Sequence, residues 1–272
     1  MTGGAPIAAL PMYDGPGTAQ ANDAIWAAIA VRLRERGVAA PERLTRGGDL
    51  ASLWRSPSLV FGQTCGYPFV KDLRDSVALI ATPEYDFPGC DGVAHRSFLV
   101  RGAGDPRRSL EAFRGGVAAL NSWDSNSGMN LFRAAIAPLA RGRTFFGAVV
   151  AMGSHQRSVE AVAEGRADLA AIDCVSFGLM KRLRPNLVAR VTVVAESPLS
   201  PGLPFIASAR LPEASVAAVR EALFEALADP DLAEARAALG LKGAARVTTP
   251  ADYERVLEIE GAAEAVGYPR LA

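Results

Sequence analysis

The sequence predicts an α/β protein with two lobes, and two observations carry this prediction. Short apolar segments alternate with segments of helical periodicity along most of the 272 residues, a pattern typical of a parallel sheet with helices between its strands. Two stretches rich in Pro and Gly, residues 82–92 and 196–204, interrupt this alternation. We therefore expect a first lobe of residues 1–93 and 200–272 and an inserted second lobe of residues 94–199, joined by two crossings. The alternative is one continuous α/β domain.

The individual elements are predicted from local signals. Strands are expected at residues 7–10, 59–61, 77–80, 117–120, 148–152 and 167–173, where apolar residues run together. A helix is expected over residues 24–36, because its apolar residues recur on one side and Gly37 follows. After residue 204 the chain is expected to be mainly helical, with Pro212 at a helix start and Thr249-Pro250 as a cap followed by a first-turn proline.

Composition narrows the classes of function. Lys plus Arg and Asp plus Glu are both 29, so the net charge is zero and there is no basic excess for a nucleic-acid surface. The mean hydropathy is +0.14, yet no uninterrupted apolar run approaches the roughly 20 residues of a membrane span. An anionic ligand would have to be held by local hydrogen bonds and helix ends, since the overall charge gives no long-range attraction.

Residues 121–130 are the most informative segment. They follow the expected strand at 117–120 and precede a helix on which Met129, Phe132 and Ile136 recur. The first N–H groups of a helix have no internal partners and carry partial positive charge. With the hydroxyls of this turn as further donors and Gly128 allowing close approach, the turn can hold an anion. The simpler interpretation is that a serine caps the helix.

A second polar turn follows the expected strand at 148–152. Here Gly153-Ser154-His155-Gln156 opens a helix that Gly165 ends, and an expected strand at 167–173 comes next. The order of strand, polar turn and helix therefore repeats, and the two turns are expected to lie near each other at one edge of a sheet.

These two turns together resemble the second lobe of the phosphonate- and phosphate-type solute-binding proteins of ABC transporters. That family has a Ser-Thr-Ser-Gly helix start, matched here by residues 125–128, and a Gly-Ser-His-Asp turn, matched by residues 153–156. The resemblance implies a type 2 periplasmic-binding-protein fold with a ligand cleft between the lobes. It also implies a non-catalytic protein that captures phosphate, phosphite or a phosphonate, with an ABC permease as partner and with no cofactor or metal.

The resemblance also implies which residues bind the ligand. In the second lobe these are Ser125, Asn126, Ser127, Gly128, Ser154 and His155. In the first lobe Tyr13, Thr64 and Tyr67 follow expected strands, at the sheet edge where α/β proteins bind ligands.

The sequence departs from the family where aminoalkylphosphonate binders grip an ammonium group with carboxylates. Gln156 stands where an acid is expected, and residues 200–204 lack the acid expected after the second crossing. Asp173, with Asp124 as a weaker candidate, is the carboxylate left. The departures favour an oxyanion without an amine, or a small organic acid.

Cysteines and histidines give no sign of a metal site or of a catalytic set. Cys65 and Cys90 could pair in an exported protein, or all three cysteines could stay thiols. With His95 and His155 as the only histidines, a His-rich zinc site is excluded. Gly-x-Ser-x-Gly is absent, which removes the α/β-hydrolase elbow.

The N-terminal residues set up the main alternative. The family is periplasmic, but Met1 to Pro6 lead straight into the first expected strand, and no signal peptide is visible in this sequence. Either the start of the sequence is misassigned or trimmed, or the protein works in the cytoplasm. A cytoplasmic location therefore stays open. The alternative function is then that of a cytosolic enzyme on the same fold, which would resemble the menaquinone-pathway dehydratases and act on a small organic acid.

Overall fold

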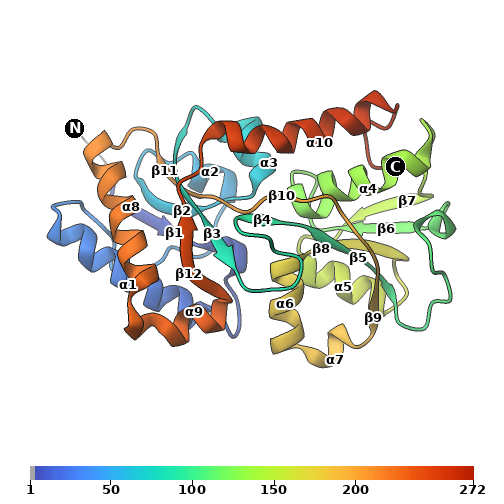
Figure 1. Ribbon diagram of the computed structural model, residues 1–272, viewed down its shortest axis with the longest axis horizontal. Coiled ribbons are helices and arrows are strands. Elements are labelled where there is room, and N and C mark those ends of the chain that lie inside the picture. The colour runs from blue at the N-terminus through green and yellow to red at the C-terminus, as the bar shows by residue number, and fades with distance from the viewer. Residues whose placement is uncertain (1–3) are drawn as a thin grey trace. The chain divides into compact units, whose positions relative to one another are not determined.

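The computed structural model describes residues 4–272, which form two compact units (Figure 1). Unit 1 contains the chain up to Asp86 and the segment Gly202–Asp252, and unit 2 contains Phe87–Pro201 and Tyr253–Ala272. The chain passes between the units after residues 86, 201 and 252. The first two passages lie within the Pro/Gly-rich stretches. The third adds the last twenty residues to unit 2, whereas the sequence-based boundaries placed them in the first lobe.

Unit 1 is built on a mixed five-stranded sheet. Its order is β1 (Ile7–Ala9), β2 (Leu59–Gln63), β11 (Phe205–Ser208), β3 (Val77–Tyr85) and β12 (Leu241–Arg246). β1 and β2 are parallel, but β11 runs antiparallel to both of its neighbours and β12 runs antiparallel to β3. The expected parallel pairing is found between β1 and β2, whereas the other pairs are antiparallel, because periodicity reports burial and not strand direction.

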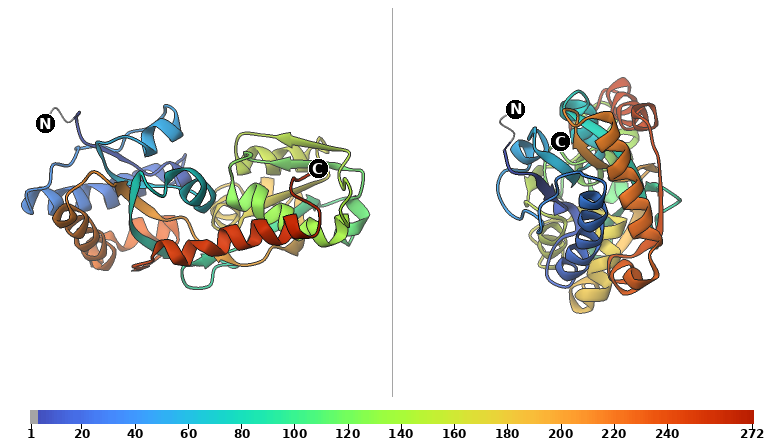
Figure 2. Two further views of the ribbon diagram at one scale, coloured as in Figure 1. Left: turned by 90° about the horizontal axis from the view of Figure 1, so that it is seen from above. Right: turned by 90° about the vertical axis from the view of Figure 1, so that its left-hand side faces the viewer.

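Helices α1 (Ala19–Glu35) and α8 (Glu213–Ala228) lie side by side in unit 1, as Figure 2 shows in blue and orange. Trp26 of α1 stacks on Phe61 of β2 with ring centroids 5.8 Å apart, and Phe61 contacts Phe205 at 5.0 Å. Gly37 follows α1 with a φ of 73°, a conformation that glycine adopts without strain. The remaining helices of this unit are α2 (Leu50–Trp54), α3 (Gly66–Pro68), α9 (Ala233–Leu239) and single turns at Pro11–Tyr13, Phe69–Leu73 and Pro230–Leu232. A further turn, Pro250–Tyr253, lies at the last passage between the units.

Unit 2 contains a second mixed sheet. Its order is β7 (Ala148–Ala151), β6 (Val117–Leu120), β8 (Leu169–Asp173), β5 (Ser97–Gly102) and β9 (Val191–Glu196). β6 is parallel to β7 and β8, whereas β5 is antiparallel to β8 and β9. A small antiparallel pair joins β4 (Ala94–His95) to β10 (Ser200–Pro201). The apolar run at 148–152 suggests a buried strand, but β7 is an edge strand and Val150 is 44% exposed.

The helices of unit 2 include α10 (Glu254–Ala265), which lies along α4 (Leu131–Ala140) (Figures 1 and 2). Asn130 Nδ2 donates to the carbonyl of Val256 at 3.1 Å, and the buried Arg133 donates to the carbonyl of Pro269 at 2.6 Å. These bonds attach the C-terminal segment to unit 2. The other helices are α5 (His155–Ala163), α6 (Cys174–Leu183), α7 (Pro185–Val188) and turns at Leu110–Phe113 and Asn126–Asn130. No helix in residues 4–272 is long and apolar enough to span a membrane.

Candidate anion-binding site

The polar segment after β6 forms one π-helical turn, Asn126–Asn130, which continues directly into α4. Ser125 is its N-cap, because the Ser125 hydroxyl accepts the N–H of Gly128 at 2.9 Å. The capping interpretation therefore describes the Ser125 side chain. The N–H of Gly128 is thus bonded to the cap. The N–H groups of Asn126 and Ser127, in the first turn, have no acceptor within the helix itself.

Ser127 lies at the centre of the site. Its hydroxyl is 3.0 Å from Nε2 of His155, the first residue of α5. Its carbonyl accepts the hydroxyl of the buried Ser97 of β5 at 2.8 Å. The two turns that sequence analysis selected are thus in direct contact, through a serine that is only 3% exposed.

His155 is the first residue of α5, directly after the N-cap residue Ser154. Ser154 caps this helix by accepting the N–H of Arg157 at 3.2 Å, so its hydroxyl has a structural role as well. Burial lowers the pKa of His155 below its ordinary value, while the nearby Asp173 raises it and His95 lowers it further. Near neutral pH the imidazole is therefore uncharged, and its Nε2 shares one hydrogen bond with the Ser127 hydroxyl.

At Gly128 the polar turn packs tightly against Asn121, the residue after β6, and against His155 of α5. A Cβ at this position would lie 1.8 Å from Oδ1 of Asn121 and 3.2 Å from Cε1 of His155. Atoms cannot approach that closely, so a side chain here would displace Asn121 and press on His155. The glycine is required by space rather than by a left-handed backbone.

Asp173 at the end of β8 is paired with His95 of β4. Oδ2 of Asp173 is 2.8 Å from Nδ1 of His95, and Oδ1 accepts the N–H of Ser176 at 2.7 Å, which caps α6. Burial opposes charge on both groups, but their mutual bond outweighs it, so the pKa of Asp173 is lowered and that of His95 is raised. Sequence analysis did not place His95 in the site, because its partner is far along the chain. Asp124, the weaker candidate, is exposed.

The amide of Asn126 belongs to a buried polar chain. It donates to the Ser200 hydroxyl at 2.8 Å, and its oxygen accepts from Asn130 at 3.0 Å. Arg133 in turn donates to Oδ1 of Asn130 at 2.7 Å. The Asn126 side chain therefore links the polar turn to β10 and to Arg133 of α4.

The residues expected from the first lobe gather at one edge of the unit 1 sheet, since β1 and β2 are parallel. Tyr13 is buried in the turn after β1 and packs edge-on against Tyr85 at 5.2 Å. Thr64 follows β2, is fully buried and donates its N–H to the carbonyl of Pro204 at 3.1 Å. Tyr67 lies in α3 with the Lys71 ammonium 5.7 Å from its ring centroid. Their contribution to ligand binding stays a prediction.

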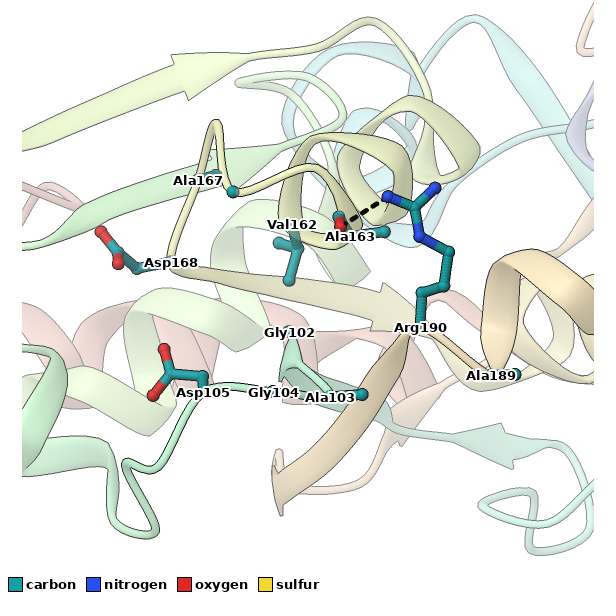
Figure 3. Close-up of a pocket in the computed structure, with 11 residues that line it drawn as sticks. Gly102, Ala103, Gly104, Asp105, Val162, Ala163, Ala167, Asp168, Ala189 and Arg190 are labelled. Carbon is teal, nitrogen blue, oxygen red and sulfur yellow. Dashed lines mark hydrogen bonds between the residues drawn. The ribbon is translucent and has the colours of Figure 1, made fainter.

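Unit 2 also contains a pocket of about 480 Å³, at the end of α5 remote from His155 (Figure 3). It is lined mostly by Gly and Ala, and none of the predicted ligand residues lines it. Figure 3 shows Asp105 and Asp168 among the lining residues, and Arg190 donating to the carbonyl of Ala163, a bond of 2.8 Å. Both carboxylates accept hydrogen bonds from Arg107. Carboxylates on the wall make it a poor anion site.

The contact between Ser127 and His155 does not form a catalytic triad. A serine nucleophile needs a base that a third group orients. The carboxylate in this region, Asp173, bonds His95 instead of His155. Among residues 4–272 there is also no cluster of three or more His, Cys, Asp or Glu side chains that could hold a metal ion. The contact between Ser127 and His155 therefore lacks the orienting carboxylate of a triad.

Comparison with solved structures supports the two-lobed fold. XAC2383 from Xanthomonas citri bound to ATP has a TM-score of 0.73 at 17% identity, with 97% of this chain and 98% of that chain covered. A binding protein component of an ABC phosphonate transporter from Pseudomonas aeruginosa has a TM-score of 0.76 at 14% identity and coverage of 97% and 88%. PhnD1 from Prochlorococcus marinus in complex with methylphosphonate has a TM-score of 0.76 at 13% identity and coverage of 96% and 98%. The fold is therefore that of the type 2 periplasmic binding proteins, with two mixed sheets.

Family comparison gives the identity of the group. No curated protein matches the chain. A family model described as "ABC transporter, phosphonate, periplasmic substrate-binding protein" matches residues 58–253, which is more than half of the chain. That span includes both polar turns, His95 and Asp173. The chain belongs to the family of periplasmic substrate-binding proteins of phosphonate ABC transporters.

Proposed function

We propose that the protein captures a small phosphorus oxyanion, of the phosphate, phosphite or phosphonate class, in the periplasm and delivers it to an ABC permease. The observation that carries this proposal is the contact of 3.0 Å between Ser127 and His155, where two helices begin in a buried polar region. A helix start, a hydroxyl and an imidazole together offer several donors to an anion. Membership of the phosphonate-transporter family supports the same class of ligand.

The pairing of Asp173 with His95 argues against a ligand that carries an amine. An ammonium group needs a carboxylate whose charge it can neutralise. Asp173 already has its charge balanced by a buried imidazole at 2.8 Å, and Gln156 is uncharged. An aminoalkylphosphonate would therefore gain little from its amine in unit 2 and would lose the hydration of that group.

A panel of ligands tests the proposal by thermal shift and calorimetry. Phosphate, phosphite and methylphosphonate should raise the melting temperature, because a ligand that binds the native state stabilises it by about 2.7 kcal/mol at a hundred times its Kd. Ethylphosphonate and 2-aminoethylphosphonate form a matched pair, and the amine should give no gain in affinity. Malate and ATP belong in the panel, since structures of this fold with those ligands are known. Binding of malate alone, with its conversion to a product, would support the enzyme alternative instead.

Ser127→Ala should weaken binding of the best phosphorus oxyanion by roughly ten- to a hundred-fold, the value of one hydrogen bond to a charged group. Its effect on the melting temperature of the ligand-free protein should be small. Ser125→Ala is the matched control two residues away. It removes the cap on Gly128, so it should cost about 1 kcal/mol of stability. Titration calorimetry and thermal denaturation of both variants separate the two roles, and the reverse outcome would move the anion site elsewhere.

Binding should weaken as the pH rises from the lowered pKa of His155 in the free protein toward its higher pKa in the complex. The free protein holds this imidazole neutral, since burial lowers its pKa. A bound anion beside Nε2 favours the protonated form, so binding takes up a proton between the free and bound pKa values. The affinity then falls by up to about tenfold per pH unit in that interval. The variant His155→Gln keeps a hydrogen-bond donor at this position but cannot take up a proton.

The comparison of wild type with His155→Gln isolates the histidine, because the titration of the probe itself is common to both proteins. Calorimetry in two buffers of different ionisation enthalpy measures the proton uptake directly. Identical pH profiles in the two proteins would show that His155 stays neutral in the complex.

A further inference from the structure

Two of the three cysteines lie against each other in unit 2. Sγ of Cys90 is 3.5 Å from Sγ of Cys174, although the two residues are 84 positions apart in sequence. Cys174 is buried at the start of α6 and Cys90 is half-buried. Sequence analysis left open a pairing of Cys65 with Cys90. Cys65 belongs to unit 1, whereas Cys90 and Cys174 share unit 2.

The segment that carries Cys90 is packed tightly on α6. A Cβ on Gly89, which has a φ of 94°, would lie 2.8 Å from Cβ of Cys174 and 2.9 Å from the Phe98 ring. One turn further along α6, the ring of Phe87 fills the space where a side chain on Gly178 would be, with its Cδ1 2.2 Å from that Cβ position. The guanidinium of Arg182 covers the same ring at 4.4 Å from its centroid.

These contacts determine where the two sulfurs are. Glycines at positions 89 and 178 allow the backbone of residues 87–90 to approach α6 closely, and the Phe87 ring fixes the segment at its other end. The sulfurs need to approach by about 1.5 Å to reach the bonded distance of roughly 2.05 Å.

We propose that Cys90 and Cys174 form a disulfide when the protein meets a disulfide oxidant, either a protein dithiol–disulfide oxidase or an oxidised small thiol. The Cys90 thiolate attacks the oxidant disulfide and releases one of its thiols. The Cys174 sulfur then attacks the mixed disulfide and releases the second thiol. Two protein thiols become one disulfide, and the two electrons and two protons pass to the oxidant. Cys90 attacks first because it is the more exposed sulfur, and the hydrogen bond with Cys90 together with burial raises the pKa of Cys174.

The bond would tie the first residue of α6 to the segment just after the passage between the units at residues 86–87. Cys174 directly follows Asp173, so the same bond would restrain the carboxylate that holds His95. Because the bond closes a long loop, it should raise the melting temperature by roughly 10 °C relative to the dithiol form.

The purified full-length protein tests this after equilibration with oxidised glutathione or with a reductant, followed by acid quench, alkylation under denaturing conditions and mass mapping. The oxidised form should alkylate at Cys65 alone and yield a linked peptide containing Cys90 and Cys174. Cys65→Ser is the matched control and should keep the difference in melting temperature between the two redox states. Cys90→Ser should abolish it.

Alkylation of all three cysteines after oxidation, or a linked peptide that contains Cys65, would overturn the assignment. So would equal melting temperatures of oxidised and reduced Cys65→Ser. These readouts need no ligand, so they are independent of the proposed function.

Discussion

Asp173→Asn should lower the free energy of unfolding by about 3–5 kcal/mol, the cost of removing one partner of a buried ion pair. The Asp173 and His95 side chains are only 2% and 4% exposed, and no solvent can replace the lost charge. Asn can still accept the N–H of Ser176, so the cap on α6 survives while the pair with His95 is lost. Urea denaturation followed by a probe in unit 2 measures the change.

Asp49→Asn is the matched control. Asp49 caps α2 by accepting the N–H of Ser52 at 2.8 Å, with the same spacing of three residues as Asp173 and Ser176, but it is exposed. It should leave stability nearly unchanged. The double variant His95→Gln with Asp173→Asn should lose less than the sum of the single losses, because two amides can share a hydrogen bond. Additive losses would show that the two residues act independently.

The same pair sets a pH window for stability. The pKa of Asp173 is lowered, so its contribution is present above the ordinary carboxyl pKa of about 4 and is lost as the pH falls through the folded value. The pKa of His95 is raised, so its contribution is present below the ordinary imidazole pKa of about 6.5 and is lost as the pH rises through the folded value. Both contributions are complete between about pH 4 and 6.5, and Asp173→Asn should flatten this dependence.

The two polar turns of the candidate site could be predicted from the local sequence. Ser127 and His155 each begin a helix after a strand, and the carboxyl ends of neighbouring parallel strands meet at one edge of a sheet. That rule alone brings the two turns together, and the structure places their side chains 3.0 Å apart. The sequence does not distinguish Ser125, which caps the helix, from Ser127, which contacts His155, because both serines fit the N-cap preference equally well.

The parts that sequence missed depend on contacts between distant segments. The antiparallel direction of β5 leaves no trace in its apolar run, and it is this strand that brings Ser97 under Ser127. Likewise, α10 has an ordinary helical sequence, and one of its contacts with the rest of unit 2 is the bond from the Asn130 side chain to the carbonyl of Val256. A backbone acceptor has no signature in the amino-acid sequence, so neither contact could be anticipated.

Gly128→Ala should damage the candidate site more than Ser127→Ala does. The new methyl group would lie 1.8 Å from Oδ1 and 2.8 Å from Cγ of Asn121, so the amide must rotate away. It would also press on the ring of His155, where the distance is 3.2 Å. Overpacking of this kind costs about 1–3 kcal/mol of stability. The loss of affinity for a phosphorus oxyanion should exceed that of Ser127→Ala, because the polar turn and His155 shift together.

Gly261→Ala provides the control, since Gly261 lies within α10 with no atom within 4 Å of a Cβ at that position. That exchange should raise stability by about 0.5–1 kcal/mol, because alanine favours a helix over glycine. Adding Asn121→Ala to Gly128→Ala removes the amide that clashes and should restore most of the lost stability. Calorimetry of the double variant then decides what the amide does. Recovered binding would mean that Asn121 only fills space, whereas binding that stays lost would place its side chain among the groups that hold the anion. If Gly128→Ala alone binds as tightly as wild type, the close contact between the two turns is not needed for capture, and the proposed site is wrong.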